Sequence, residues 1–173
     1  MDLDLPDIFA ATKSLVPTGT WAARDLHPGK SDWITFTASL EINEITIAGL
    51  KLKATAISRL PDRAVRFQLE YHHRRRAGPA LARIEWRPLK GHNNKAIGPP
   101  EHRHRQLNSC HRHPFDLNWA HSPGQVRRGN LLIAVPIADS PKSFGALLEF
   151  VGEEFRINGI ERVPQPPWAP ELW

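Results

Sequence analysis

The sequence predicts an α+β protein in which an antiparallel β-meander carries a His/Arg-rich insertion and is followed by a packed C-terminal helix. β-Branched and aromatic residues cluster with partial alternation between residues 33 and 87, as in half-buried strands. Residues 141–155 instead repeat apolar side chains at helical spacing. The 173-residue chain has the size of one domain. We therefore expect a single domain over residues 1–163 and a Pro/Trp-rich C-terminal tail over residues 164–173.

The first half of the chain is predicted to form one short helix and then the strands of the meander. Residues 5–16 place apolar side chains at helical spacing, and Pro6 suits a first helical turn. Residues 65–71 alternate cleanly, so Val65, Phe67, Leu69 and Tyr71 share one face of a strand. Strands are expected over residues 33–39, 42–47, 50–57, 65–71 and 81–87, with a kink or turn at 48–49 and turns at 27–30 and 60–63.

The second half is predicted to contain an irregular segment, one strand and one helix. Residues 89–129 look irregular because Gly, Pro, Asn and His occur throughout, whereas residues 131–137 are an apolar run suited to a buried strand. Ser140 and Pro141 then supply an N-cap and a first-turn proline for a helix whose apolar stripe runs through Phe155. The four prolines and two tryptophans of residues 163–173 predict an extended arm laid on the body or on a partner.

Composition and motifs exclude several classes of protein. No run of 18 apolar residues exists, and the acidic start lacks the features of a signal peptide, so we expect no membrane association. Cys110 is the only cysteine, which excludes an internal disulfide framework and makes the cytoplasm the default compartment. The P-loop, the dinucleotide-binding glycine motif, the nucleophile elbow and the His-Glu-x-x-His motif are all missing. Nucleotide hydrolysis, dinucleotide redox chemistry and α/β-hydrolase chemistry are therefore not expected.

Charge is segregated along the chain. Residues 71–129 contain twelve Lys or Arg against three acids, a net charge of +9, and also eight of the nine histidines. The remaining residues contain eleven Lys or Arg against fifteen acids, a net charge of −4. An acidic body with one basic, histidine-dense segment predicts a single site for an anionic partner, and nucleic acid is the natural candidate.

Two His-x-His pairs, His102/His104 and His111/His113, form the densest group of chemically active residues. Alternate residues of a strand share a face, so each pair presents both imidazoles the same way. If residues 105–110 connect a hairpin, His102 lies opposite His113 and His104 opposite His111, which brings four imidazoles onto one face. Arg103 and Arg112 would then oppose each other on the other face. A looser basic loop with incidental histidines is the alternative interpretation.

Such a cluster suits two kinds of chemistry. Neutral and protonated imidazoles can take and give a proton at neutral pH, and nearby arginines stabilise charge on a phosphorus oxygen. These are the requirements of RNA cleavage through the 2′-hydroxyl. The same histidines, with or without Cys110, also suit a zinc or other transition-metal ion, although their spacing matches no common zinc-finger pattern. The sequence therefore leaves the presence of a metal open.

Arg83 and His92 are further candidates upstream of these pairs. Alternation places Arg83, Glu85 and Arg87 on one strand face, where Arg83 would bind phosphate and Glu85 would orient a histidine or Arg83. His92 would lie on the loop that leads into the site. A solvated strand face with an internal ion pair is the alternative.

Other basic residues are candidates for contact with a nucleic-acid backbone. The aromatic residues Trp86, Phe115 and Trp119 could stack on bases or lie in the core, and the sequence does not decide between these two positions. The basic candidates are Arg74, Arg75, Arg76, Arg103, Arg105 and Arg112.

Arg-Ile-Glu-Trp (83–86), Gly-His-Asn-Asn (91–94) and Gly-Pro-Pro-Glu-His-Arg-His (98–104) together resemble a pattern in small bacterial proteins. The pattern is similar to that of the TumE-like toxins of toxin–antitoxin pairs, which carry a late His-x-His and are thought to act on RNA. The resemblance covers about residues 81–157 and implies roles for Arg83, His92, His102 and His104, with Glu85 where an aspartate is usual. His111-Arg-His113 and the meander before Tyr71 depart from the pattern.

The sequence therefore favours a small RNA-directed protein, with an endoribonuclease toxin that uses histidine acid–base catalysis as the leading hypothesis. In this hypothesis His102 and His104 are the favoured acid–base pair, and Arg83 and Arg103 hold the phosphate. An antitoxin-like protein is the partner that this hypothesis implies. The alternative is a non-catalytic module that binds nucleic acid or protein, in which the histidines are solvated or hold a structural metal.

Overall fold

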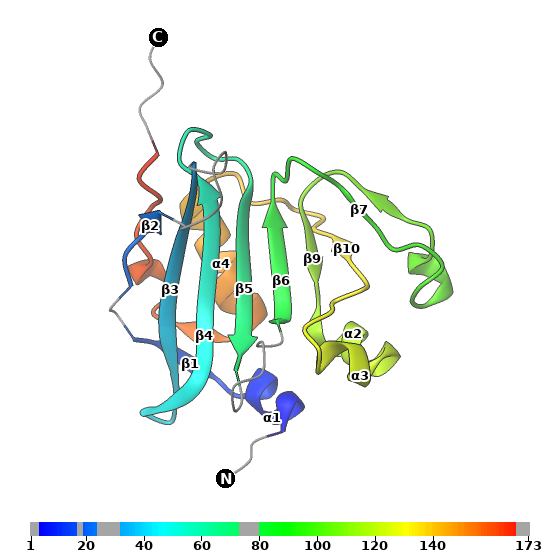
Figure 1. Ribbon diagram of the computed structural model, residues 1–173, viewed down its shortest axis with the longest axis horizontal. Helices are drawn as coiled ribbons and strands as arrows, with labels where there is room; N and C mark the ends of the chain where they lie inside the picture. Colours follow the sequence, from blue (N-terminus) through cyan, green and yellow to red (C-terminus); the bar gives the residue numbers. More distant parts are fainter. Residues whose placement is uncertain (1–3, 17–18, 24–31, 73–79, 169–173) are drawn as a thin grey trace.

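The computed structural model describes residues 4–16, 19–23, 32–72 and 80–168, and these form one large sheet with helices at its back and edges (Figure 1). The described helices are α1 (Leu5–Ala10), α2 (Phe115–His121), α3 (Pro123–Val126) and α4 (Phe144–Phe155), with 3-10 turns η1 (Pro100–His102) and η2 (Ile160–Arg162). The described strands are β1 (Lys13–Leu15), β2 (Ala22–Ala23), β3 (Trp33–Ile42), β4 (Ile45–Ile57), β5 (Val65–Tyr71), β6 (Ala80–Trp86), β7 (His92–Asn93), β8 (Gln106–Leu107), β9 (His111–His113), β10 (Val135–Pro136) and β11 (Ile157–Asn158).

Strand order confirms the predicted α+β class. The large sheet runs β10-β9-β6-β5-β4-β3-β1-β11, and β2 pairs with β3 beside this path. β3, β4, β5 and β6 form the expected antiparallel meander, while β7 and β8 form a separate two-stranded sheet. β9 comes from the basic insertion and adds to the free edge of β6 in antiparallel register. The insertion therefore continues the sheet instead of forming a loop outside it.

The first hairpin turns earlier than the sequence predicted. The expected break at residues 48–49 lies inside β4, and the chain instead turns at Asn43 and Glu44, whose φ angles are +52° and +63°. Two left-handed residues between antiparallel strands match the twist of a tight hairpin. Gly49, at φ +85°, remains in the strand because a Cβ there would lie 2.0 Å from the carbonyl oxygen of His72. The glycine thus permits close strand pairing and does not mark a turn.

The helix predicted over residues 5–16 ends at Ala10, and its second half is strand β1. Lys13 causes the stop, since its buried ammonium donates to the carbonyl oxygens of Ile8, Phe9 and Ala11, the last acceptors of the helix. β1 then pairs with β3 and, in parallel, with β11.

The strand predicted over residues 131–137 is reduced to Val135–Pro136. Two buried side-chain amides replace the missing strand partner. Asn118 accepts from the N–H of Ile133 and donates to its carbonyl, and Asn94 does the same for Ala134, with all four distances at 2.8–2.9 Å. The segment before it, residues 89–129, is also more ordered than predicted, because it contains three strands and two helices. Both differences arise because residues that are far apart in the sequence contact one another.

Helix α4 covers one face of the sheet (Figure 1). Its predicted stripe of Phe144, Leu147, Leu148, Val151 and Phe155 is buried, and the Phe144 ring lies 6.3 Å from that of Phe67 on β5. The helix begins at Ser143, which caps it by accepting from the N–H of Ala146, and not at Ser140. No described helix lies over the opposite face of β3–β6 in Figure 1. The side chains of that open face carry the site.

The described part of the tail packs against the body. Trp21 donates from its indole N–H to the carbonyl of Pro164 at 2.7 Å, and the Trp168 ring lies 5.8 Å from Phe144. The domain boundary at residue 163 stays a prediction. None of the helices in the described ranges is long and apolar enough to cross a membrane.

Candidate active site

The open face of the sheet carries two rows of polar side chains that cross the strands. Strand register brings these residues opposite one another, and β-strand alternation turns them away from α4. We call the rows the first and second polar rows. The first polar row is Thr35, Thr55, Arg66, Glu85 and His111, and the second is Thr37, Lys53, Gln68, Arg83 and His113.

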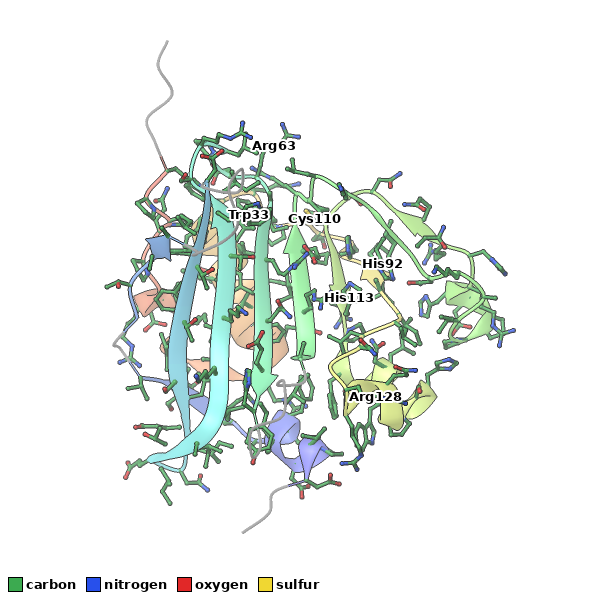
Figure 2. All side chains as sticks on the ribbon, viewed as in Figure 1. Trp33, Arg63, His92, Cys110, His113 and Arg128 are labelled. Atoms are coloured by element: carbon green, nitrogen blue, oxygen red, sulfur yellow. The ribbon has the colours of Figure 1, made fainter. Side chains whose placement is uncertain are left out.

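Three imidazoles converge where these rows end. His111 and His113 lie on the same face of β9, and His92 of β7 packs against both (Figure 2). The ring centroids are 4.7 Å apart for His92 and His113, 5.5 Å for His111 and His113, and 6.0 Å for His92 and His111. His113 therefore lies against both of the other rings, and the rings of His92 and His111 are the two that lie farthest apart.

Backbone carbonyls fix which nitrogen of each ring is free. His111 and His113 donate from Nδ1 to the carbonyls of Ser109 and Leu131, at 2.8 and 2.9 Å, so that their Nε2 atoms remain available. His92 donates from Nε2 to the carbonyl of Leu132 at 3.1 Å, which leaves Nδ1 available. The three side chains thus each combine a structural hydrogen bond with one uncommitted nitrogen.

Burial keeps two of the three histidines neutral. His111 and His113 are each 2% exposed. Burial, and next the charge of Arg83, hold the pKa of His113 well below its ordinary value. Burial also lowers the pKa of His111, against the opposing effects of the Ser109 carbonyl and Glu85. Both rings therefore have a free lone pair at neutral pH.

Arg83 supplies the positive charge of the cluster. It pairs in register with His113, and its Nε is buried without a hydrogen-bond partner among the described residues. Burial, and then Arg66, lower the pKa of Arg83, but a guanidinium with so high an ordinary pKa remains charged. Glu85 does not orient a histidine by a hydrogen bond: its Oε1 accepts from Arg66 Nε at 2.7 Å. Among the described residues Arg83 Nε thus has no hydrogen-bond partner, and the charges of Glu85 and Glu70 offset part of the lowering of the Arg83 pKa.

The predicted hairpin of the two His-x-His pairs is wrong. β9 pairs with β6 and β10, whereas residues 106–107 pair with β7, so His102 and His104 do not lie opposite His113 and His111. His102 ends the turn η1, and His104 is exposed at φ +57°. Figure 1 shows this turn at the outer end of the β7–β8 extension. The hairpin fails because β6 offers β9 a longer and more buried partner strand.

The basic candidates lie in different surroundings. Arg112 was expected to oppose Arg103, but it faces α4 and forms an ion pair with Glu154. Arg103 donates to the carbonyl of Gly98 at 2.7 Å, and Arg105 is exposed. Arg74, Arg75 and Arg76 lie outside the described residues.

The aromatic candidates are largely core residues. Trp86 is fully buried and donates to the carbonyl of Pro141, and Phe115 is buried in a stack between Phe9 and Trp119. Trp119 is half-buried, with the guanidinium of Arg127 over its ring at 4.8 Å. Within residues 4–16, 19–23, 32–72 and 80–168, no three His, Cys, Asp or Glu side chains are arranged to hold a metal ion.

Sequence reasoning missed the part of the open face that lies on β4 and β5. Lys53, Thr55, Arg66 and Gln68 alternate with buried apolar residues, of which those of β5 were correctly predicted to share one face. The alternation thus carried the signal, because the polar residues of such a strand must share a face. What it could not supply was the register that aligns them with His111 and His113.

Comparison with models of protein families, with curated proteins and with solved structures found no match to this chain.

Proposed function

We propose that this protein acts on RNA and cleaves it through the 2′-hydroxyl by histidine acid–base catalysis. The observation that carries the proposal is the convergence of His92, His111 and His113 beside Arg83. Acid–base cleavage of RNA needs a base, an acid and a fixed cation within reach of one phosphate. These four side chains supply all three.

His111 is the base in this proposal. Its Nδ1–H is held by the Ser109 carbonyl, so that Nε2 faces substrate with a lone pair. Glu85, its neighbour across the strands, partly offsets the lowering of the His111 pKa by burial, which keeps the ring a better base than His113. His113, neutral and beside Arg83, positions the phosphate as a hydrogen-bonding group.

His92 is the acid. The carbonyl of Leu132 holds its Nε2–H, so the proton that it donates is carried on Nδ1. The 2′-hydroxyl proton moves to His111 Nε2 while the 2′-oxygen bonds to phosphorus. The bond from phosphorus to the 5′-oxygen breaks, and that oxygen takes the proton from His92 Nδ1. The products are a 2′,3′-cyclic phosphate and a 5′-hydroxyl, and Arg83 stabilises the charge on the phosphorus oxygens.

Substrate access requires a movement in this proposal. His111 and His113 are each 2% exposed, and His92 of β7 packs against both. The β7–β8 sheet is only two residues long on each strand and is separate from the large sheet. RNA binding would lift this short sheet from β9.

The TumE-like resemblance supports the same reaction class with one change of residues. Arg83 and His92 keep the roles that the resemblance implies, but His111 and His113 replace His102 and His104 as the His-x-His pair beside them. An antitoxin-like protein and a bacterial toxin–antitoxin role belong to this proposal.

The test is cleavage of a labelled RNA with and without EDTA, using variants that keep each structural hydrogen bond. His111→Asn places an amide N–H near the position of Nδ1, and His92→Gln places one near Nε2, so both retain the bond to a backbone carbonyl. Each should reduce kcat by about 10²-fold or more. The double variant His102→Ala/His104→Ala is the matched control and should cleave like wild type. Equal background cleavage by all four proteins would refute the catalytic proposal.

A non-catalytic RNA-binding module is the second candidate, favoured by one observation. Every ring of the cluster donates a hydrogen bond to a backbone carbonyl, and two of these bonds hold the irregular segment 131–132. In that case His111→Asn and His92→Gln leave RNA affinity unchanged and no RNA is cleaved. Metal analysis of the purified protein tests the version of this candidate in which the histidines hold a structural metal.

A further inference from the structure

We infer that the open face of β3–β6 is a binding track for the nucleotides that flank the scissile phosphate, an inference that rests on the proposed action on RNA. The two polar rows lead from the histidines across β6, β5 and β4 to β3 without an interruption by an apolar residue. Four strand spacings separate β9 from β3, a length of about 19 Å. This length accommodates a run of several nucleotides and exceeds what one phosphate requires.

Charge on the rows is complementary to a phosphate backbone. Lys53, Arg66 and Arg83 give three cations against the one carboxylate of Glu85. Arg66 is engaged by that carboxylate, so Lys53 on β4 and Arg83 on β6 are the two cations of the rows that it does not pair, and both lie inside the track. Lys53 Nζ lies 3.6 Å from Glu70, with its side chain 32% exposed. Glu70 itself is only 11% exposed, but at 3.6 Å the contact is longer than a hydrogen bond, and the ammonium keeps N–H donors for a phosphate.

Hydroxyl groups on the first polar row point to a polar ligand. Thr55 is 4% exposed, and its Oγ1 is buried with no hydrogen-bond partner among the described residues. Thr35 pairs with Thr55 in the strand register, and its Oγ1 is also buried with no hydrogen-bond partner among the described residues. Unpaired buried hydroxyls are destabilising and therefore uncommon. These two face each other at the β3 end of the track, and a ligand that opens a way to them would supply the missing partner.

A groove lies at the β3 end of the track. It has a volume of about 530 Å³ and is lined by Thr35, Thr37 and Lys53 of the polar rows together with residues of β2 and its N-terminal flank. Its lining combines three threonines and one lysine with two alanines and a glycine, and such small side chains with one cation suit a sugar and phosphate better than a stacked base. The track therefore has a catalytic end at the histidines and a nucleotide subsite at the groove.

Single-stranded RNA is the occupant that these features favour. The rows offer cations and hydroxyls along one path across the strands and themselves contain no Phe, Tyr or Trp ring. Trp86 lies in the core, and Trp33, two residues before Thr35, shares the open face beside the first polar row. Such a surface contacts the sugar-phosphate backbone and is indifferent to base identity. We therefore expect little sequence preference at the flanking positions.

The experiment is fluorescence anisotropy with 2′-O-methyl oligonucleotides, which bind but cannot be cleaved. A dinucleotide and an octanucleotide are each titrated with wild type, Lys53→Ala and Lys142→Ala. Lys142 is exposed at the approach to α4, outside both polar rows, and its removal changes net charge by the same amount. Lys53→Ala should weaken octanucleotide binding about fivefold and reduce the salt slope by about 0.7, the value for one phosphate of a single strand. Dinucleotide binding should stay unchanged.

Thr55→Val provides a second variant that preserves side-chain shape. It should weaken octanucleotide binding about threefold, with no loss of thermal stability. Equal octanucleotide affinities for Lys53→Ala and Lys142→Ala, or no octanucleotide binding by wild type, would overturn the inference. The outcome for the track is separate from that for catalysis. If octanucleotide binding depends on Lys53 but no RNA is cleaved, the binding track is supported and the catalytic proposal is rejected. If RNA is cleaved but octanucleotide binding does not depend on Lys53, the catalytic proposal is supported and the track is rejected.

Discussion

Asn94 should be among the most destabilising sites of side-chain truncation in the insertion, although the sequence gives it no distinction from Asn93. Its fully buried amide accepts from the N–H of Ala134 at 2.9 Å and donates to the carbonyls of Ala134 and His102 at 2.9 and 2.8 Å. Asn94→Ala removes three hydrogen bonds and leaves buried backbone groups unpaired. Since each such bond contributes about 1 kcal/mol, the free energy of unfolding should fall by about 3 kcal/mol.

The neighbouring residue is the matched control. Asn93 is exposed, and its amide bonds only to Gln106 and to the N–H of Lys95. Asn93→Ala should therefore lower the free energy of unfolding by less than about 1 kcal/mol. Urea titration followed by tryptophan fluorescence measures both variants. With a denaturant dependence of about 2 kcal/mol per molar, the midpoint of Asn94→Ala should fall by roughly 1.5 M.

A second readout connects this loss to the site. Asn94 fixes Ala134, and the preceding residues Leu131 and Leu132 accept the hydrogen bonds of His113 and His92. Loosening the segment should broaden the imidazole resonances of both histidines in an NMR spectrum. If Asn94→Ala is no less stable than Asn93→Ala, side-chain amides do not replace the missing strand ladder, and the explanation of this segment is wrong.

Three further predictions concern pH, the polar rows and the glycines. Burial lowers the folded-state pKa of His113 and His111, so below about pH 6.5 the unfolded chain binds more protons than the folded chain. The free energy of unfolding should therefore fall as the pH falls, by at most about 1.4 kcal/mol per pH unit for each ring. Urea midpoints measured between pH 7.5 and 5 should decline less steeply for His113→Asn than for wild type, and an equal decline would contradict this. Thr55→Val removes an unpaired buried hydroxyl and should raise the free energy of unfolding by roughly 1 kcal/mol, so a lower thermal midpoint would show that the hydroxyl has a partner. Gly49→Ala should lower that free energy by roughly 3 kcal/mol because of its positive φ and the His72 carbonyl, whereas Gly145→Ala, in open space on α4, should raise it by about 0.5 kcal/mol; equal effects in calorimetry would refute the distinction.

Local patterns predicted the elements whose structure depends on their own residues. The alternation of Val65–Tyr71 and the stripe of Phe144–Phe155 gave β5 and α4 with correct faces, because burial of one face selects the period directly. The prediction was wrong where a side chain outside the element determined the local backbone structure. Lys13 ends α1 from outside the helix, and Asn94 and Asn118 satisfy residues 133–134 in place of a strand.

The candidate site divides in the same way. Residue types and spacing identified Arg83, His92, His111 and His113, since a charged, histidine-dense segment is visible in composition alone. They favoured His102 and His104, whose spacing matches that of His111 and His113, as the acid–base pair. Pairing between β6 and β9 placed only His111 and His113 beside Arg83. Strand register depends on which strand edge is free and on how much apolar surface the pairing buries.

By itself, then, the sequence determined that this protein has an α+β fold with one basic segment rich in histidine, because periodicity and composition are properties of neighbouring residues. Only the tertiary structure decided which histidines converge, which arginine lies beside them with an Nε that has no partner among the described residues, and that Lys53 and Thr55 align with them across the sheet. Those choices depend on strand register, which in the two polar rows pairs residues 11 to 30 positions apart and is fixed only when the whole sheet is assembled.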